Sequence, residues 1–204
     1  KQCGCKEIVV ASTAAVYGNS RSFPLSENSD LDPLNPYATS KYMMEALCKA
    51  VPDDVSVAVL RFFNVFGERQ LNEGGYLSAV PIFLNQFKNN LELTVTGDGQ
   101  QTRDFVYVKD TVKGFLKILQ CEKLLGQEVN IASQTEISIG EIANILIDKI
   151  NPNAKIELDN VRLRPKKSEV YRLFGSKEKL CHYTDWKQEY SFSKAIDETI
   201  DWFS

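Results

Sequence analysis

Short apolar runs alternate along the chain with segments in which apolar residues recur every three or four positions. Runs of the first kind are typical of strands buried in a parallel sheet, and segments of the second kind are typical of amphipathic helices. The pattern predicts strands or extended segments at 6–11, 55–65, 91–95, 103–108, 127–132, 155–158 and 170–174. It predicts helices at 36–51, 77–88, 109–120, 139–150, 176–181 and 193–202. Strands that alternate with helices indicate an α/β fold with a mainly parallel sheet.

Residues typical of helix starts support two of these helices. Asn35 can cap the helix that begins at Pro36, since proline is favoured at the first helical position. Ser138 and Glu141 stand three residues apart at the start of an apolar-periodic segment, which is the pattern of a capping box. We therefore expect helices to start at residues 36 and 139.

A glycine-rich turn is missing from the first strand–helix connection. A doubly wound dinucleotide-binding fold normally opens with a strand, a glycine-rich turn and a helix, and the amides of the turn hold a pyrophosphate. Neither G-x-G-x-x-G nor G-x-x-G-x-x-G occurs in the 204 residues, and a predicted strand already begins at residue 6. Either the chain binds no dinucleotide, or it is the C-terminal part of a longer protein.

Composition speaks against several classes of function. The 24 basic and 27 acidic residues give a net charge of −3 without a basic tract, so nothing favours nucleic-acid binding. No apolar run approaches the roughly 18 residues of a membrane helix, and the N-terminus is unlike a signal peptide. The five cysteines are irregularly spaced and His182 is the only histidine, which suits reduced thiols and argues against zinc. We expect a cytoplasmic protein without metal, nucleic-acid or membrane partners.

Tyr37 and Lys41 are the most informative pair of polar residues. They fall at positions i and i+4 of a predicted helix, so they lie on one face and one turn apart. An ammonium close to a phenol favours the phenolate, which lets the phenol act as an acid/base. Ser12 and Thr13 follow a predicted strand and could bring a hydroxyl to the same reacting oxygen.

The same Tyr-x-x-x-Lys spacing occurs twice more, at Tyr183–Lys187 and at Tyr190–Lys194. The first copy lies in a turn with Trp186 and the second at a helix start, and we interpret both as structural. Spacing alone therefore does not identify the pair that carries chemistry.

Six longer motifs run from one end of the chain to the other: ASTAAVYG (11–18), PYATSK (36–41), LRFFNVFGERQ (60–70), VTGDGQQTRDFVYVKDTVKG (95–114), VNIAS (129–133) and AIDETIDWF (195–203). Their sequence and order resemble the extended short-chain dehydrogenase/reductase family, specifically its nucleotide-sugar epimerases and dehydratases. The resemblance implies a Rossmann-like doubly wound parallel sheet with a smaller α/β substrate-binding lobe. It also implies that the leading third, with the glycine-rich turn, is missing.

The resemblance assigns roles to the polar residues near the Tyr-Lys pair. Tyr37 is the expected catalytic acid/base, which removes the proton of the sugar 4-hydroxyl as hydride leaves C4 for NAD. Lys41 supports Tyr37 and hydrogen-bonds the nicotinamide ribose of NAD. Thr13 holds the 4-oxygen of the sugar. Ser12, Tyr37, Lys41 and Phe62 form the expected cofactor-binding set, in which Phe62 lies beside the nicotinamide and Ser12 supports its neighbour.

Three further residues are expected at the diphosphate of the sugar nucleotide. By the same resemblance Asn64 contacts it, Arg103 pairs with it, and Arg164 adds a second guanidinium from a loop that diverges from the family's pattern. Guanidinium suits this role because its planar fork binds phosphate through two hydrogen bonds. Considered alone, these residues allow simpler interpretations. Arg103 could form an ion pair with Asp104, and Arg164 could be a solvated charge. Asn64 could be a turn residue, and Phe62 could fill a core.

Ala14 and Ala15 bear on the type of reaction. In the family that the chain resembles, dehydratases usually carry an Asp-Glu pair after the Ser/Thr, and related decarboxylases carry a Glu there. Ala14 and Ala15 occupy these positions, and a methyl group cannot transfer a proton. The pair favours an epimerase, in which the 4-keto intermediate takes the same hydride back on its other face. The segment LRPKKSEVYRLFGSKEKL (163–180) instead resembles some bacterial amino-sugar 4,6-dehydratases.

Three hypotheses follow for the function. The first is NAD-dependent 4-epimerisation of a nucleotide-diphosphate sugar, UDP-glucose/UDP-galactose or their N-acetyl forms, as in UDP-glucose 4-epimerase. The second is a 4,6-dehydratase or reductase of the same fold. The third is a non-catalytic fragment or an interaction partner that binds no dinucleotide.

The resemblance also implies domains and an assembly. Residues 1–68 and 104–135 are expected to form the remaining part of the NAD-binding Rossmann-like domain, and 69–103 and 136–204 the sugar-nucleotide lobe. The helix that starts at Pro36 is expected to pair with a second copy in a homodimer. Met43, Met44, Leu47 and Cys48 give it apolar surface for this contact, and they could equally be core residues.

Overall fold

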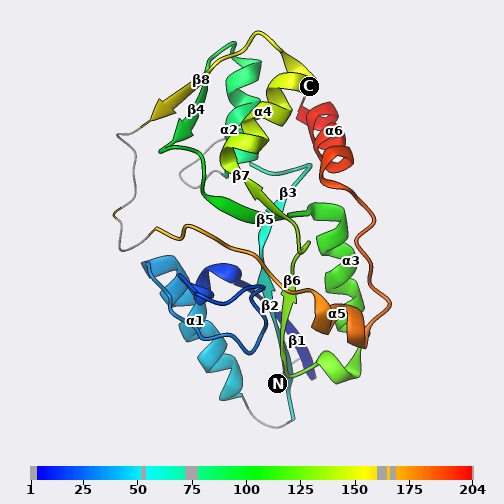
Figure 1. Cartoon of the computed structure of the whole chain (residues 1–204). Coiled ribbons are helices and arrows are strands. Elements are labelled where there is room, and N and C mark those ends of the chain that lie inside the picture. Colours follow the sequence, from blue (N-terminus) through cyan, green and yellow to red (C-terminus); the bar gives the residue numbers. More distant parts are fainter. Residues whose placement is uncertain (1–3, 52–53, 72–77, 160–164, 166–168, 204) are drawn as a thin grey trace.

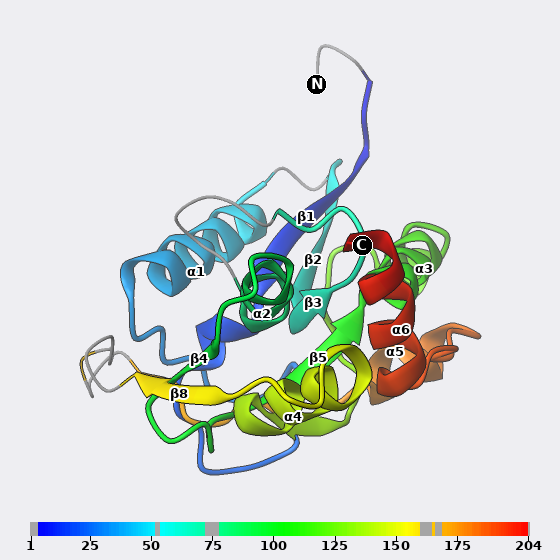
Figure 2. The ribbon, with the colours of Figure 1, turned by 90° about the horizontal axis from the view of Figure 1, so that it is seen from above.

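A three-stranded parallel sheet forms the lower half of the molecule in Figure 1, in the order β1 (Glu7–Thr13), β2 (Ser56–Phe62) and β6 (Glu128–Ile131). The computed structural model describes residues 4–51, 54–71, 78–159, 165 and 169–203. Seen from above, α1 (Pro36–Lys49) and α3 (Val108–Leu119) lie on opposite sides of the strands (Figure 2). Helices on both sides of a parallel sheet are the doubly wound arrangement, so the predicted α/β fold class is confirmed.

The upper half of Figure 1 contains a mixed sheet in the order β3 (Asn64–Phe66), β5 (Thr102–Tyr107) and β7 (Glu136–Ser138). β3 pairs with β5 in parallel, and β7 pairs with β5 antiparallel. Two further strands, β4 (Leu93–Thr96) and β8 (Ile156–Asp159), pair in parallel. The helices of this half are α2 (Ala79–Lys88), α4 (Ile139–Ile150) and α6 (Phe192–Phe203), and α5 (Glu178–Tyr183) lies below, against β6.

Four segments differ from the sequence-based expectation. The strand predicted at 55–65 is two strands, because the chain leaves the first sheet after Phe63 and pairs with β5 instead. The segment predicted as extended at 170–174 forms single bridges at Arg172 and Gly175, and it belongs to no named strand. β7 was not predicted. The helix expected from residue 77 begins at Ala79, and residue 77 lies outside the described residues.

Apolar side chains gather in two cores. The first surrounds the β1-β2-β6 sheet, and the second lies among β5, α2, α4 and α6. Residues of the segment 170–186, among them Leu173 and Trp186, pack in the first core. The division of the chain into the domains 1–68 with 104–135 and 69–103 with 136–204 stays a prediction.

β1 lies at the edge of its sheet. Within the described residues it pairs only with β2, and its other side carries no strand. The strand is apolar, yet Ile8 is 39% exposed and most of its other residues are half-buried or exposed.

Candidate active site

The carboxyl end of β1 presents the Thr13 hydroxyl. The strand ends there and a short 3-10 turn, η1 (Ala14–Tyr17), follows. The side chain of Thr13 caps this turn, because its oxygen accepts a hydrogen bond from the amide of Ala15 at 3.2 Å. Since the oxygen is the acceptor here, the hydroxyl keeps its own proton for donation. The neighbouring strand β2 places Phe62 directly opposite Thr13 in the sheet register, and Phe62 packs in part against the first core.

α1 carries Tyr37 and Lys41 to this same end of the sheet. Asn35 caps the helix as predicted, since its side chain accepts from the amide of Ala38 at 2.9 Å, and Pro36 takes the first position. The ammonium of Lys41 donates to the carbonyl oxygen of Ala11 at 2.8 Å, two residues before Thr13. Tyr37 lies one turn earlier on the same helix face, and its side chain is 52% exposed. The structure thus brings the Thr13 hydroxyl and the Lys41 ammonium to one end of β1, and Tyr37 lies one turn from Lys41 on the same helix face.

Ser12 takes a different position from the one expected. It is 3% exposed, and its hydroxyl donates to the carboxylate of Glu45 on α1. Successive residues of a strand point to opposite faces, so a side chain next to Thr13 in sequence faces away from it. This placement does not support the predicted contact between Ser12 and a cofactor.

The residues expected at a diphosphate lie on β3 and β5. Asn64 begins β3 opposite Phe105, and it is half-buried. The guanidinium of Arg103 on β5 donates to the carbonyls of Thr102 at 2.8 Å and Tyr171 at 3.2 Å, and it lies 3.4 Å from the carboxylate of Glu169. Arg164 lies outside the described residues.

Asp104 does not act as the ion-pair partner of Arg103 that the sequence allowed. Its buried carboxylate accepts hydrogen bonds from the amide and hydroxyl of Ser133, both at 2.7 Å, from the amide of Gln134 at 3.0 Å and from the amide of Gly175 at 3.2 Å. Asp104 therefore ties β5 to two loops, while Arg103 on the other side of the strand is directed elsewhere.

Residues 169–176, here called the crossing segment, run between the two halves of the molecule (Figure 1). The side chain of Asn19 donates to the Glu169 carbonyl at 2.7 Å and accepts from the Tyr171 amide at 3.2 Å. The Tyr171 carbonyl in turn accepts from the Thr102 amide on β5 at 3.0 Å. The crossing segment therefore joins the loop between Thr13 and Tyr37 to the strand that carries Arg103.

Arg172 fixes the crossing segment to β7. Its guanidinium binds the carboxylate of Glu136 through two hydrogen bonds, at 2.7 and 2.8 Å, and it stacks 4.2 Å from the centre of the Phe23 ring. The hydrogen bonds from Arg172 hold the pKa of Glu136 below its ordinary value. A carboxyl whose pKa is lowered on folding stabilises the fold above its unfolded pKa of about 4.3, and the contribution is lost as the pH falls through the folded value.

We expect Arg172→Gln to lower the melting temperature at neutral pH, and the difference from the native chain to shrink as the pH is lowered below about 4. Thermal unfolding at a series of pH values measures this, with the exposed Arg21→Gln as the matched control. A difference that stays constant down to about pH 3 would mean that Arg172 acts through its stacking on Phe23 rather than through Glu136.

Two buried charges beneath the site were missed by sequence reasoning. Glu45 and Arg61 are each 2% exposed and form an ion pair. Both left a signal in the sequence. Arg61 interrupts an apolar run that is typical of a buried strand, and a buried charge requires a partner. Glu45 continues the i, i+4 spacing of Tyr37 and Lys41 by one more turn.

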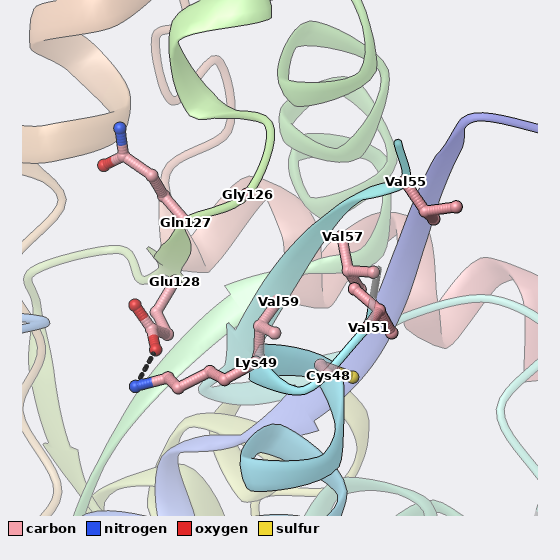
Figure 3. Close-up of a pocket in the computed structure, with 9 residues that line it drawn as sticks. All are labelled: Cys48, Lys49, Val51, Val55, Val57, Val59, Gly126, Gln127 and Glu128. Carbon is pink, nitrogen blue, oxygen red and sulfur yellow. Dashed lines mark ion pairs between the residues drawn. The ribbon is translucent and has the colours of Figure 1, made fainter. Parts of the chain in front are cut away.

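A hollow of about 260 Å³ lies away from this site, at the amino ends of β2 and β6 (Figure 3). Four valines between residues 51 and 59 line it, and the ion pair of Lys49 and Glu128, 2.7 Å long, lies on its wall. Thr13 and Phe62 stand at the opposite, carboxyl ends of the strands. Ligands of open α/β sheets bind at the carboxyl ends, so the hollow is not part of the candidate site.

Two further kinds of feature are absent from the described residues. In the ranges that the structure covers, no helix has the length and apolar character needed to cross a bilayer. The same residues contain no group of three or more His, Cys, Asp or Glu side chains arranged to hold a metal ion.

Comparison with known proteins identifies the family. Residues 1–132 match the model of the NAD dependent epimerase/dehydratase family. The chain belongs to this family. The resemblance seen in the sequence motifs is thereby confirmed, and the members of the epimerase/dehydratase family to which the chain is similar include both kinds of enzyme.

Three relatives illustrate the range of the epimerase/dehydratase family. A protein of Methanocaldococcus jannaschii with the provisional name UDP-glucose 4-epimerase is 33% identical over 199 residues, which are 97% of this chain and 62% of that protein. The human dTDP-D-glucose 4,6-dehydratase is 30% identical over an aligned length of 205, which covers 97% of this chain and 56% of the enzyme. The structure of the UDP-glucuronic acid 4-epimerase of Bacillus cereus with UDP-glucuronic acid and NAD superposes with a TM-score of 0.86 at 27% identity, over 97% of this chain and 61% of that chain. The chain thus spans less than two thirds of each relative.

Proposed function

We propose that the whole protein is an NAD-dependent 4-epimerase of a nucleotide-diphosphate sugar, such as UDP-glucose/UDP-galactose or their N-acetyl forms, that acts in the cytoplasm. The observation that carries the proposal is the pair of alanines directly after Thr13. Ala14 is 2% exposed and Ala15 is half-buried, and together they form the first residues of η1. Neither side chain can move a proton, whereas elimination of water from a 4-keto sugar needs a further acid and base. Epimerisation needs only one acid/base, which Tyr37 can supply.

Residues of this chain fit the nicotinamide end of NAD. The Lys41 ammonium donates one hydrogen bond to the Ala11 carbonyl, and its other protons remain for a ribose hydroxyl. Phe62 stands at the carboxyl end of the adjacent strand, where a ring could lie beside a nicotinamide. The glycine-rich turn that holds the pyrophosphate has no counterpart in the 204 residues. When bound, NAD accepts a hydride and returns it.

Three side chains would then share the proton chemistry. Thr13 donates its hydroxyl proton to the 4-oxygen of the sugar and holds it in place. Tyr37 takes the proton of the 4-hydroxyl, and Lys41 stabilises the phenolate that accepts it. In the return half-reaction Tyr37 gives the proton back to the 4-oxygen. One acid/base therefore serves both directions, and no net oxidant is consumed.

Arg103 and Asn64 would hold the diphosphate of the substrate. The side chain of Arg103 is 12% exposed, and its guanidinium lies 3.4 Å from the carboxylate of Glu169. Its planar fork matches the geometry of a phosphate group, which it can bind through two parallel hydrogen bonds. We place Arg164 in the same subsite by resemblance.

We propose that α1 pairs with the α1 of a second copy in a homodimer. Besides Tyr37, its exposed large apolar side chains are Tyr42 at 43%, Met43 at 61% and Leu47 at 71%. Met44 and Cys48 are half-buried in the same helix, so they serve the interior at least in part. An apolar helix face of this kind is typical of a surface that another subunit covers.

A second candidate is a nucleotide-sugar 4,6-dehydratase. The similarity to the human dTDP-D-glucose 4,6-dehydratase and the dehydratase-like segment 163–180 favour it. A non-catalytic role remains the alternative in a chain without the glycine-rich turn.

Proton NMR of the whole protein with UDP-glucose and UDP-N-acetylglucosamine tests the proposal. We expect inversion at C4 without loss of any other carbon-bound proton, because Tyr37 is the only acid/base that the mechanism requires. A 4-keto-6-deoxy product would replace the epimerase by the dehydratase. An unchanged spectrum with both sugars would favour the non-catalytic alternative or another nucleotide.

A further inference from the structure

The buried ion pair between Glu45 and Arg61 lies directly behind the residues of the candidate site. Arg61 donates hydrogen bonds to both carboxylate oxygens of Glu45, from Nε to Oε1 at 3.1 Å and from Nη2 to Oε2 at 2.7 Å. Glu45 belongs to α1, and Arg61 belongs to β2, the middle strand of the first sheet. The pair therefore joins the helix that carries Tyr37 to the sheet beneath it.

Ser12 binds the same carboxylate from the end of β1. Its hydroxyl donates to Oε1 of Glu45, and Ser12 and Arg61 are direct neighbours in the sheet register, one position before Thr13 and Phe62. Glu45 thus binds side chains on two adjacent strands, one residue before the pair Thr13 and Phe62 at the candidate site.

The spacing on α1 aligns this contact with the site. Glu45 follows Lys41 by four residues and Tyr37 by eight, so all three share one helix face. Lys41 binds the carbonyl of Ala11, and Glu45 binds the side chain of Ser12. Two consecutive turns of α1 are therefore attached to two consecutive residues of β1, immediately before Thr13.

The remaining donor group of Arg61 extends the network to the loop that precedes α1. Nη1 donates to the Tyr17 hydroxyl at 3.0 Å and to the Glu27 carbonyl at 3.2 Å. Burial raises the pKa of Tyr17 to about 12, so its hydroxyl stays protonated and donates to the side chain of Asn130 at 2.7 Å. Both carboxylate oxygens of Glu45 and all three nitrogens of the Arg61 guanidinium are therefore hydrogen-bonded.

A buried ion pair is a poor source of stability, since the cost of removing two charges from water offsets much of their attraction. Apolar residues of similar volume often stabilise a fold as well or better. What the pair adds over an apolar contact is direction, because a bidentate fork fixes the position of the carboxylate. We propose that Glu45, held by Arg61, is a positioning residue. It fixes the position of α1 relative to the carboxyl end of β1 and so aligns Tyr37 and Lys41 with Thr13. The inference rests on the proposed function.

The double variant Glu45→Met/Arg61→Met in the whole protein separates positioning from stability. Removal of both charges leaves no unpaired buried ion, so we expect the melting temperature to stay within about 4 °C of the native protein. We expect kcat to fall about 10²-fold with KM nearly unchanged, because a displacement near 1 Å of a reacting group has an effect of that size. Lys49→Met is the matched control on the same helix, and it removes only an exposed ion pair. A double variant with native stability and native kcat would overturn the inference.

Ser12→Ala provides a second test that leaves the ion pair in place. It removes only the contact between Glu45 and β1, so it keeps the inference testable if the double variant does not fold. We expect a kcat loss of about 10-fold at unchanged KM. Ser12→Thr, which restores a hydroxyl, should recover part of the rate, and a rate equally low in both variants would contradict the role of this hydrogen bond.

Amide hydrogen exchange distinguishes failure of the inference from failure of the proposed function. If the native protein converts no nucleotide sugar, the proposed function fails, and exchange at residues 37–44 still reports how firmly α1 is held. We expect faster exchange there in the double variant than in Lys49→Met at matched global stability. Equal exchange rates in these two variants would overturn the positioning role without reference to any activity.

Discussion

Tyr37→Phe is expected to lower kcat of the whole protein by about 10²–10⁴-fold, the range that a positioned acid/base contributes. The variant removes one oxygen from a side chain that is 52% exposed, at the end of β1 where Lys41 and Thr13 also lie. A surface substitution of this kind changes stability by no more than about 0.5 kcal/mol. The loss should therefore be seen in turnover of the nucleotide sugar, while the melting temperature and the affinity for NAD stay as in the native protein.

Tyr183→Phe is the matched control for this variant. Tyr183 begins another Tyr-x-x-x-Lys, and its side chain is 40% exposed at the end of α5. We expect native kcat in this control. Equal kcat in Tyr37→Phe and in the native protein would remove Tyr37 from the proposed mechanism, and a loss in both variants would indicate a general effect of the removed hydroxyls.

Gly18→Ala is expected to have the largest effect on stability, about 3 kcal/mol or more. Gly18 follows η1 with φ +60° and ψ −139°, a combination nearly confined to glycine. An added Cβ would lie 1.9 Å from the backbone carbonyl oxygen of Asp32. Neither backbone can rotate away as a side chain could, so the loop between Thr13 and Tyr37 has to open. We expect a lower denaturant midpoint in equilibrium unfolding, together with a lower kcat because the start of α1 is displaced.

Gly126→Ala separates the effect of the backbone angle from that of the clash. Gly126 has φ +78°, and no atom of the described residues lies within 4 Å of an added Cβ. This control should lose only about 1–2 kcal/mol, the cost of a left-handed conformation with a side chain. If both variants were destabilised to the same extent, the close approach of Gly18 to Asp32 would not matter.

Local sequence signals predicted the elements that depend on local contacts. α4 was predicted with its observed bounds because Ser138 and Glu141 form a capping box at its start. α1 was predicted to start at Pro36 because Asn35 caps it. The break at Phe63 was not predicted, because the residues on both sides of it are mostly apolar and only the choice of pairing strand changes. β7 is three residues long and exists because it pairs with β5, a contact that is distant in sequence.

The candidate site divides in the same way. The i, i+4 spacing of Tyr37 and Lys41 predicted that they share a helix face, and motif resemblance added Thr13 and Arg103. Glu45 and Arg61 are 16 residues apart and meet only after the helix packs on the sheet. Sequence could indicate that Arg61 needs a partner, but it could not name the partner.

The open side of β1 has a practical consequence for anyone who handles residues 1–204 as an isolated polypeptide. Its free edge offers a row of backbone donors and acceptors flanked by Ile8, Val9 and Val10, with no proline or bulge to deter an incoming strand. Such an edge is a template for strand addition, so self-association through cross-molecular sheets is the expected failure in the test tube. Turbidity and loss of soluble material would then result from pairing at the exposed edge of β1 and not from low stability of the hydrophobic core.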